Sequence, residues 1–243
     1  MNVLENLYQR TIIPLSLFGV DISITNGVIT LWVAGISVLF FFFLATCSLK
    51  LVPGTAQNLA ETMVIFLRNE MGEQLGTEKD KWLPFIIALF FFVLFCNLAG
   101  LIPIFSGVTA NINVTGTLAV IVFLVVHLSG IKKRGLVSYA RSLVPCDIPF
   151  FVQVLMVPIE FLSQLAKPFS LALRLFANMF AGHALMMILL SLIFIFKSYL
   201  VIPLPLLGDF IFSIFEVFVA FIQAFIFAYL SSLYIATALE ENH

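Results

Sequence analysis

Charged side chains are scarce in this sequence. Asp, Glu, Lys and Arg make up 10% of its 243 residues, whereas 62% are hydrophobic; in soluble domains roughly one-quarter of the residues are charged. The 12 basic and 13 acidic residues give a net charge of -1, which leaves no basic stripe for nucleic acid. Water therefore cannot be the main solvent of this chain, and we expect no nucleic-acid partner.

Cysteine is also rare. Cys47, Cys96 and Cys146 are far apart and lack CxxC or Cys/His spacing, so we interpret them as packing residues and expect neither a metal nor a cofactor. The sequence contains no GxxxxGK[ST] phosphate loop and no HExxH zinc motif, so we expect no catalytic site of its own. The N-terminus lacks the features of a signal peptide, which predicts that it is the mature end.

Long apolar runs are abundant instead. A transmembrane helix needs about 20 largely uncharged residues to cross roughly 30 Å of hydrocarbon. Residues 28–47, 83–104 and 114–131 meet this requirement and end at charged residues, proline or glycine. The sequence predicts an all-α, polytopic membrane helical bundle that forms a single domain over residues 1–243.

The remaining segments predict two other kinds of helix. Residues 148–199 and 206–239 are apolar but too long for upright spans, since the part from 169 to 196 alone would measure about 42 Å. We expect them to form a long oblique hairpin. In residues 55–75, one set of apolar side chains recurs at helical spacing opposite Glu61, Arg68 and Glu70, which predicts an amphipathic helix on the membrane surface; the set is Leu59, Met63, Phe66 and Leu67.

Basic residues indicate the orientation. Residues 48–82 and the segment after 131 carry several lysines and arginines, whereas residues 106–113 carry none. The positive-inside rule places both basic segments on the cytoplasmic or equivalent side, here called the inner side.

A few ionisable residues interrupt the apolar C-terminal part. Each such group costs free energy inside a membrane, with figures from about 3 to more than 10 kcal/mol for a central arginine, and marks a functional site by default. The ionisable residues of interest are Glu160, Arg174, His183 and Glu216, accompanied by the neutral Asn178 and Gln223. They favour a path for protons or other ions.

Arg174 lies on a helix face of small or polar residues. At about 100° per residue, this face also carries Ser170, Ala177, Asn178, Ala181 and Leu185, and all of these but Leu185 are small or polar, so another helix can approach closely. A permanently charged arginine attracts a carboxylate without itself carrying protons. The alternative is that Arg174 snorkels to an interface or pairs with Glu160 or Glu216.

His183 and Glu216 are candidates for proton exchange. His183 lies nine residues after Arg174, on roughly the opposite side of the helix and about 13 Å further along it. Glu216 and Gln223 share a face of the following helix, so an antiparallel hairpin would bring Glu216 near His183 and Gln223 near Arg174. Both groups can titrate near neutral pH once burial and attraction tune them. The alternative for His183 is a hydrogen-bonded packing role.

Other polar residues leave two interpretations open. Glu160 either belongs to a second polar path or pairs with Lys167. Asn111 and Asn113, at the outer end of the third span, either hydrate a channel entrance or cap a helix. Asn97 is expected to form a hydrogen bond between helices.

Two segments, LAKPFSLALRLFANMFAGH and FEVFVAFIQAFIFAYLSSLYIA, resemble the a-subunit family of F-type ATP synthases, and the resemblance extends from about Leu51 onward. It implies that Arg174 is the family's essential arginine, facing a ring of c subunits that each carry a buried carboxylate. It further implies that Asn178 and Gln223 lie beside it, that Glu160, His183 and Glu216 line two half-channels, and that Asn111 and Asn113 form the outer entrance.

The implied function is proton translocation through two offset half-channels, coupled to ATP synthesis elsewhere in the complex. The implied partners are the c-ring, the b subunits of the peripheral stalk, the rest of the ATP synthase and membrane lipid. We expect a bacterial inner membrane, with the mitochondrial inner membrane as the alternative. A secondary ion transporter or channel using the same charges is the rival function, and it predicts inverted repeats, which we do not find in the sequence. Proton and sodium coupling are not distinguished, nor is the size of the ring.

Overall fold

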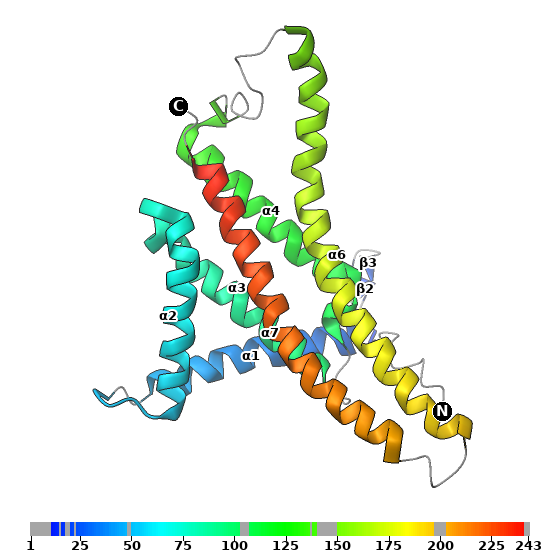
Figure 1. Cartoon of the computed structure of the whole chain (residues 1–243). Coiled ribbons are helices and arrows are strands. Elements are labelled where there is room, and N and C mark those ends of the chain that lie inside the picture. Colours follow the sequence, from blue (N-terminus) through cyan, green and yellow to red (C-terminus); the bar gives the residue numbers. More distant parts are fainter. Residues whose placement is uncertain are drawn as a thin grey trace.

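A computed structural model describes residues 11–14, 16–17, 20–21, 23–47, 50–102, 107–136, 138–139, 150–196 and 203–240. Long helices dominate it (Figure 1). They are α1 (Asn26–Thr46), α2 (Thr55–Leu75), α3 (Lys79–Gly100), α4 (Ile112–Arg134), α6 (Phe150–Phe196) and α7 (Pro203–Leu239). Two 3-10 turns, η2 (Gly76–Glu78) and η3 (Val108–Ala110), precede α3 and α4.

The helical membrane fold is confirmed. Within the described part, five helical stretches are long and apolar enough to cross a membrane, with α2 and α3 counted as one stretch. Large apolar side chains cover their outer surfaces: Trp32 is 59% exposed, Leu39 72% and Phe210 64%. In water such a surface would mark a large interface, but it suits helices surrounded by lipid. The chain is therefore a polytopic membrane helical bundle.

Short strands near the N-terminus were not predicted. β1 (Thr11–Ile13) pairs with β4 (Ile24–Thr25), and β2 (Ser16–Leu17) pairs with β3 (Val20–Asp21), each antiparallel. Strands of two or three residues are too short to show the alternation of apolar and polar residues by which a strand is recognised. They precede α1 and form no part of the helical core.

The core lies around α3, which contacts α1, α2 and α7. Phe90 and Phe91 of α3 and Phe227 of α7 are almost fully buried. Small residues of α7, including Ala220 and Ala224, let the two helices approach closely. Asn97 Nδ2 of α3 donates a hydrogen bond to the carbonyl oxygen of Ala220 at 3.3 Å, which confirms the predicted bond between helices.

The cysteines of the described part are free thiols. Cys96 is buried in α3 and Cys47 is exposed beyond the end of α1. Cys146 lies outside the described residues.

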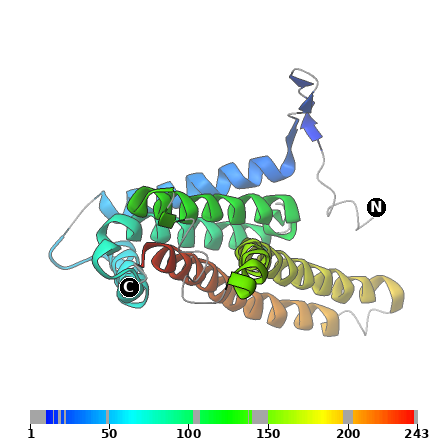
Figure 2. The same cartoon turned by 90° about the horizontal axis from the view of Figure 1, so that it is seen from above.

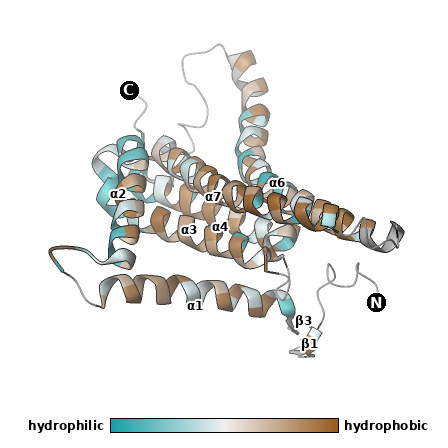
Figure 3. Ribbon diagram, turned by 60° about the horizontal axis from the view of Figure 1, so that its bottom comes forward, coloured by the Kyte–Doolittle hydropathy of each residue, from teal (hydrophilic) through white to brown (hydrophobic). Residues whose placement is uncertain are grey.

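α2 differs in character from the other helices. Figure 3 shows it as the most hydrophilic long helix beside the apolar α1, α3, α4 and α7. Leu67 and Met71 are fully buried, and the helix packs against α3 and α7. Leu59 and Phe66, which the sequence placed on the same apolar face, are 55% and 41% exposed. The buried stripe therefore lies to one side of the predicted face, where α3 and α7 cover it.

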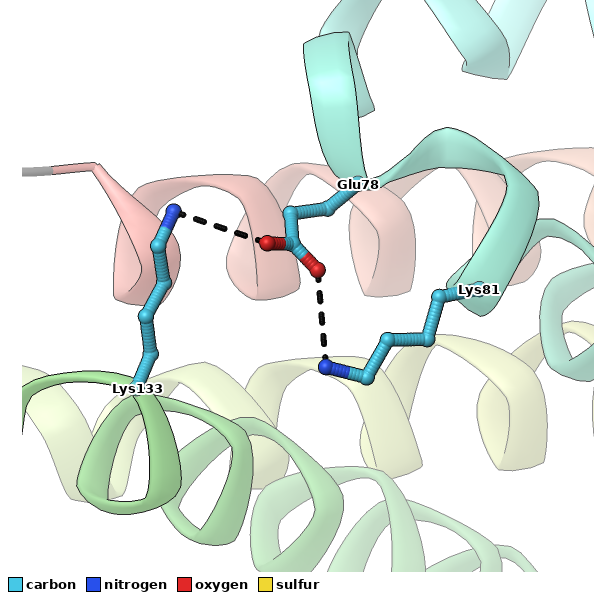
Figure 4. Close-up of polar contacts among 3 residues, drawn as sticks. All are labelled: Glu78, Lys81 and Lys133. Atoms are coloured by element: carbon cyan, nitrogen blue, oxygen red, sulfur yellow. Dashed lines mark hydrogen bonds and ion pairs between the residues drawn. The ribbon is translucent and has the colours of Figure 1, made fainter.

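Ion pairs lie at the N-terminal end of α3 and the C-terminal end of α4 (Figure 4). Glu78 lies 3.4 Å from Lys81 Nζ and 3.9 Å from Lys133 Nζ. All three side chains are partly exposed, so the pairs contribute at most about 1 kcal/mol each. They link the turn between α2 and α3 to the last turn of α4.

α6 and α7 form the long hairpin. They contact each other and run side by side in opposite directions in Figures 1 and 2. α6 has 47 residues and contains Pro158 and Pro168, so it is about 70 Å long, far more than a membrane is thick. Proline removes a helix hydrogen bond and clashes with the preceding turn, which accounts for the bend between the two halves of α6 in Figure 1.

Candidate functional site

Arg174 lies on an open face of α6. Its side chain is exposed, and among the described residues it has no hydrogen-bond or ion-pair partner, neither Glu160 nor Glu216. Ser170, Ala177 and Ala181 on the same face are also exposed. The small-residue stripe and its charge are therefore accessible to another molecule.

Two separate groups of buried polar atoms lie on either side of Arg174 along α6. His183, toward the C-terminal end of α6, lies against Gly100 and Gly107 at the end of the bundle that the sequence predicts to be the outer one. Glu160, toward the N-terminal end, lines a cavity with Arg134 at the inner end of α4. Because Glu160, Arg174 and His183 follow one another along α6, Arg174 lies between the two groups.

Glu216 belongs to the outer group. It is 3% exposed, and both carboxyl oxygens are buried without a hydrogen-bond partner in the described part of the chain. Its Oε1 lies where a side chain at Gly182 would begin, so only glycine leaves room for this carboxyl group. Gly182 directly precedes His183, and the hairpin thus places Glu216 at the height of His183.

His183 approaches the same corner from α6. Its Nε2 is buried and has no hydrogen-bond partner among the described residues. The imidazole edge faces Gly107, and a Cβ at Gly100 would lie 3.3 Å from Nε2. Buried polar atoms without partners are costly, and a site with several of them is suited to ordered water.

Gln223, near the middle of α7, carries a further buried polar atom without a partner among the described residues. It is 5% exposed and its Nε2 has no partner within the described ranges. Ala220, between Glu216 and Gln223, receives the Asn97 hydrogen bond, and Asn97 Oδ1 is likewise unpaired there. Gln223 forms no hydrogen bond to Arg174, whereas Asn178 is half-buried beside the arginine face.

The inner group lines a cavity of about 160 Å³. Glu160 Oε1 accepts a hydrogen bond from Gln164 Nε2 at 2.7 Å, and Lys167 Nζ donates one to Gln164 Oε1 at 3.1 Å. Gln164 therefore joins Glu160 to Lys167, and the direct ion pair considered from the sequence is replaced by this bridge.

Two further residues of this cavity were not singled out from the sequence. Arg134 Nε and Nη2 are buried and have no partner within the described segments. Tyr139 Oη lies 2.8 Å from His127 Nδ1, and burial raises the pKa of Tyr139 above its ordinary 10.0 although Arg134 acts in the opposite direction. Only the structure shows that Arg134 and Tyr139 line one cavity with Glu160.

The two asparagines at the outer end of α4 differ in their roles. Asn111 is the N-cap of α4, and its Oδ1 accepts a hydrogen bond from the Asn113 backbone nitrogen at 2.9 Å. This capping bond accounts for Asn111 structurally. Asn113 is exposed.

Comparison with known proteins decides the family. The family described as ATP synthase A chain matches residues 28–236, a range that contains Arg174 and both polar groups. This chain belongs to that family. The prediction from the two C-terminal segments is confirmed.

Curated relatives in the family agree. ATP synthase subunit a of Rubrobacter xylanophilus is 37% identical over 98% of this chain and 94% of its own length. ATP synthase subunit a of Chloroherpeton thalassium is 39% identical over 93% of this chain and 69% of its length. ATP synthase subunit a 2 of Chlorobaculum tepidum is 40% identical over 94% of this chain and 67% of its length.

Membership of the ATP synthase A chain family fixes the general role. The chain is a non-catalytic, multi-pass membrane subunit that takes part in proton transport.

Proposed function

We propose that this subunit conducts protons through two offset half-channels at its interface with a rotating c-ring, and that Arg174 separates them. One observation carries this proposal: Arg174 is exposed on a small-residue face, between a buried polar group at each end of the bundle. Neither group of polar side chains extends past Arg174 along α6. A proton therefore passes from one group to the other only on a carboxyl group of the ring.

The outer path uses His183 and Glu216. Protons enter past Asn113 and Asn111, reach the buried pair, and protonate a carboxylate of the ring as it passes the hairpin. The neutral carboxyl group can then enter lipid, since the cost of burying its charge is gone. The unpaired oxygens of Glu216 and the unpaired Nε2 of His183 support a water-filled path here.

The inner path uses Glu160 and its cavity. After nearly a full turn the ring carboxyl group meets Arg174, whose fixed charge favours the ionised form and so promotes loss of the proton. The proton leaves toward Glu160. Asn178 and Gln223 orient water or the carboxylate beside Arg174. The membrane potential contributes about 2.3 kcal/mol per charge for each 100 mV.

We infer the partners from the family together with this arrangement. The stripe around Ser170, Arg174 and Ala177 is the face for the c-ring, the apolar surfaces of α1 and α4 face lipid, and the b subunits of the peripheral stalk hold the chain against the rotating ring. We place the complex, an F-type ATP synthase, in a bacterial plasma membrane, because the named relatives are bacterial.

The test is ATP-driven acidification of inside-out vesicles that carry the whole complex. We expect Arg174→Ala to abolish pumping, whereas Gly116→Ala, where an added Cβ would meet nothing within 4 Å, pumps within about twofold of wild type. Both are compared at equal amounts of assembled complex. Normal pumping by Arg174→Ala would demote the arginine to a packing or snorkelling residue.

A further inference from the structure

His183 is held in a slot made by two glycines from outside its own helix. A Cβ at Gly107 would collide with Nε2 and would lie 2.8 Å from Cδ2. A Cβ at Gly100 would lie 3.3 Å from Nε2 and 3.4 Å from the Gly107 Cα. The two glycines are therefore neighbours, and the imidazole edge that carries Nε2 rests against them.

The glycine at 107 is required for space and not for backbone conformation. Its φ is −63° and its ψ is 86°, and this φ is accessible to any residue. Gly100 likewise has no positive φ, since the positive-φ glycines of the described part are Gly76 and Gly135. What a side chain at 107 would change is thus the position of the His183 ring.

Thr109 lies two residues after Gly107 along the chain. It belongs to η3, which contacts α3, α4 and α6. Its side chain is 0% exposed and its hydroxyl oxygen has no hydrogen-bond partner among the described residues. If Thr109 only filled space here, valine would fill it at lower free energy, because an unpaired buried hydroxyl group is costly.

We propose that the segment Gly107–Ala110 forms the last step of proton entry to His183, with Gly107 leaving the space for Nε2 and Thr109 holding the water that exchanges a proton with it. This inference rests on the proposed function and adds two positioning residues to it. In the step, a hydronium ion or a protonated water chain gives a proton to His183 Nε2 and leaves neutral water behind. His183 then passes the proton on toward Glu216 and the ring carboxylate.

Substitutions at Thr109 separate a hydroxyl role from a packing role. Thr109→Val keeps the shape and removes the hydroxyl group, whereas Thr109→Ser keeps the hydroxyl group and removes a methyl group. We expect passive proton flux through the membrane part of the complex, measured at equal complex content, to fall at least fivefold for the valine variant and to stay within twofold for the serine variant. Valine equal to or better than serine overturns the proposal, since packing would then explain Thr109.

Gly107→Ala provides a second test that leaves the hydroxyl group in place. We expect it to lower proton flux at least tenfold because the methyl group displaces His183. Gly116→Ala is the matched control, since a Cβ at Gly116 would meet nothing within 4 Å, and its flux should equal that of wild type. Normal proton flux in Gly107→Ala would show that His183 does not need the space that Gly107 leaves.

The Arg174→Ala complex distinguishes failure of this inference from failure of the proposed function. If Arg174→Ala abolishes ATP-driven pumping while Thr109→Val and Gly107→Ala conduct normally, the general mechanism stands and the entry step is wrong. If Arg174→Ala pumps normally, the proposed function itself fails.

Discussion

Glu216 of α7 lies directly against Gly182 of α6. The carboxyl group occupies the space that any side chain at residue 182 would need, although it has no hydrogen-bond partner in the described part of the chain. An unpaired buried carboxyl group is costly. Packing alone therefore does not explain a carboxyl group at this position beside His183, whereas a role in proton exchange does.

At this scale we predict that Gly182→Ala strongly reduces ATP-driven pumping. The added methyl group forces Glu216 out of its position, and loss of one well-placed proton-exchanging group lowers such rates by roughly a hundredfold or more. Glu216→Asp in the same chain shortens the acid by one methylene group and should restore part of the activity. Pumping is measured by vesicle acidification at equal complex content.

The control for this substitution is Gly208→Ala in α7. A Cβ there would lie 3.8 Å from Leu189 Cδ2, an ordinary contact, so pumping should be unchanged. If Gly182→Ala pumps as well as Gly208→Ala, Glu216 does not depend on that space.

At the scale of the helices, hydrophobic length and charge position allowed the membrane helices to be recognised. Lys132 to Arg134 mark the end of α4, and Pro53 and Gly54 lie just before α2. The bend of α6 and the buried face of α2 were harder to predict from the sequence, because both depend on which neighbouring helix covers which side chains. Leu67 shows this, since it shares the predicted apolar face with Leu59 and Phe66 but is the one that neighbouring helices bury.

The two faces of α7 give a second prediction. Phe227 is fully buried in the core, whereas Phe218 is 60% exposed. Phe227→Ala removes a large buried side chain and should cost about 3–5 kcal/mol, enough to lower the amount of assembled subunit in the membrane and its resistance to heat. Phe218→Ala should leave assembly nearly unchanged. Immunoblots of heated membranes compare the two, and equal loss in both would mean that Phe218 is also buried in the complex.

At the scale of the whole molecule, the sequence could propose the chemical groups of the candidate site but not all their surroundings. Arg174, His183, Glu216 and Glu160 were recognisable because ionisable residues are rare in apolar helices. Gly107, Thr109 and Arg134 were not, because their relation to these groups arises only when η3 packs against α6 and Arg134 lines a cavity with Glu160. Glycine and threonine carry no charge that would draw attention in a sequence.

The orientation of the bundle gives the last prediction. α4 has Asn113 at one end and Lys132–Arg134 at the other, and its 23 residues span about 35 Å. If the positive-inside rule holds, Leu136, which is 67% exposed, faces the inner solution, and Asn113 faces the outer one. In a background with the native cysteines replaced by serine, Leu136→Cys should react with a membrane-impermeant maleimide in inside-out vesicles, and Asn113→Cys in right-side-out vesicles. The reverse pattern would exchange the inner and outer paths, so that protons would enter past Glu160 and leave past His183, while Arg174 would still separate them.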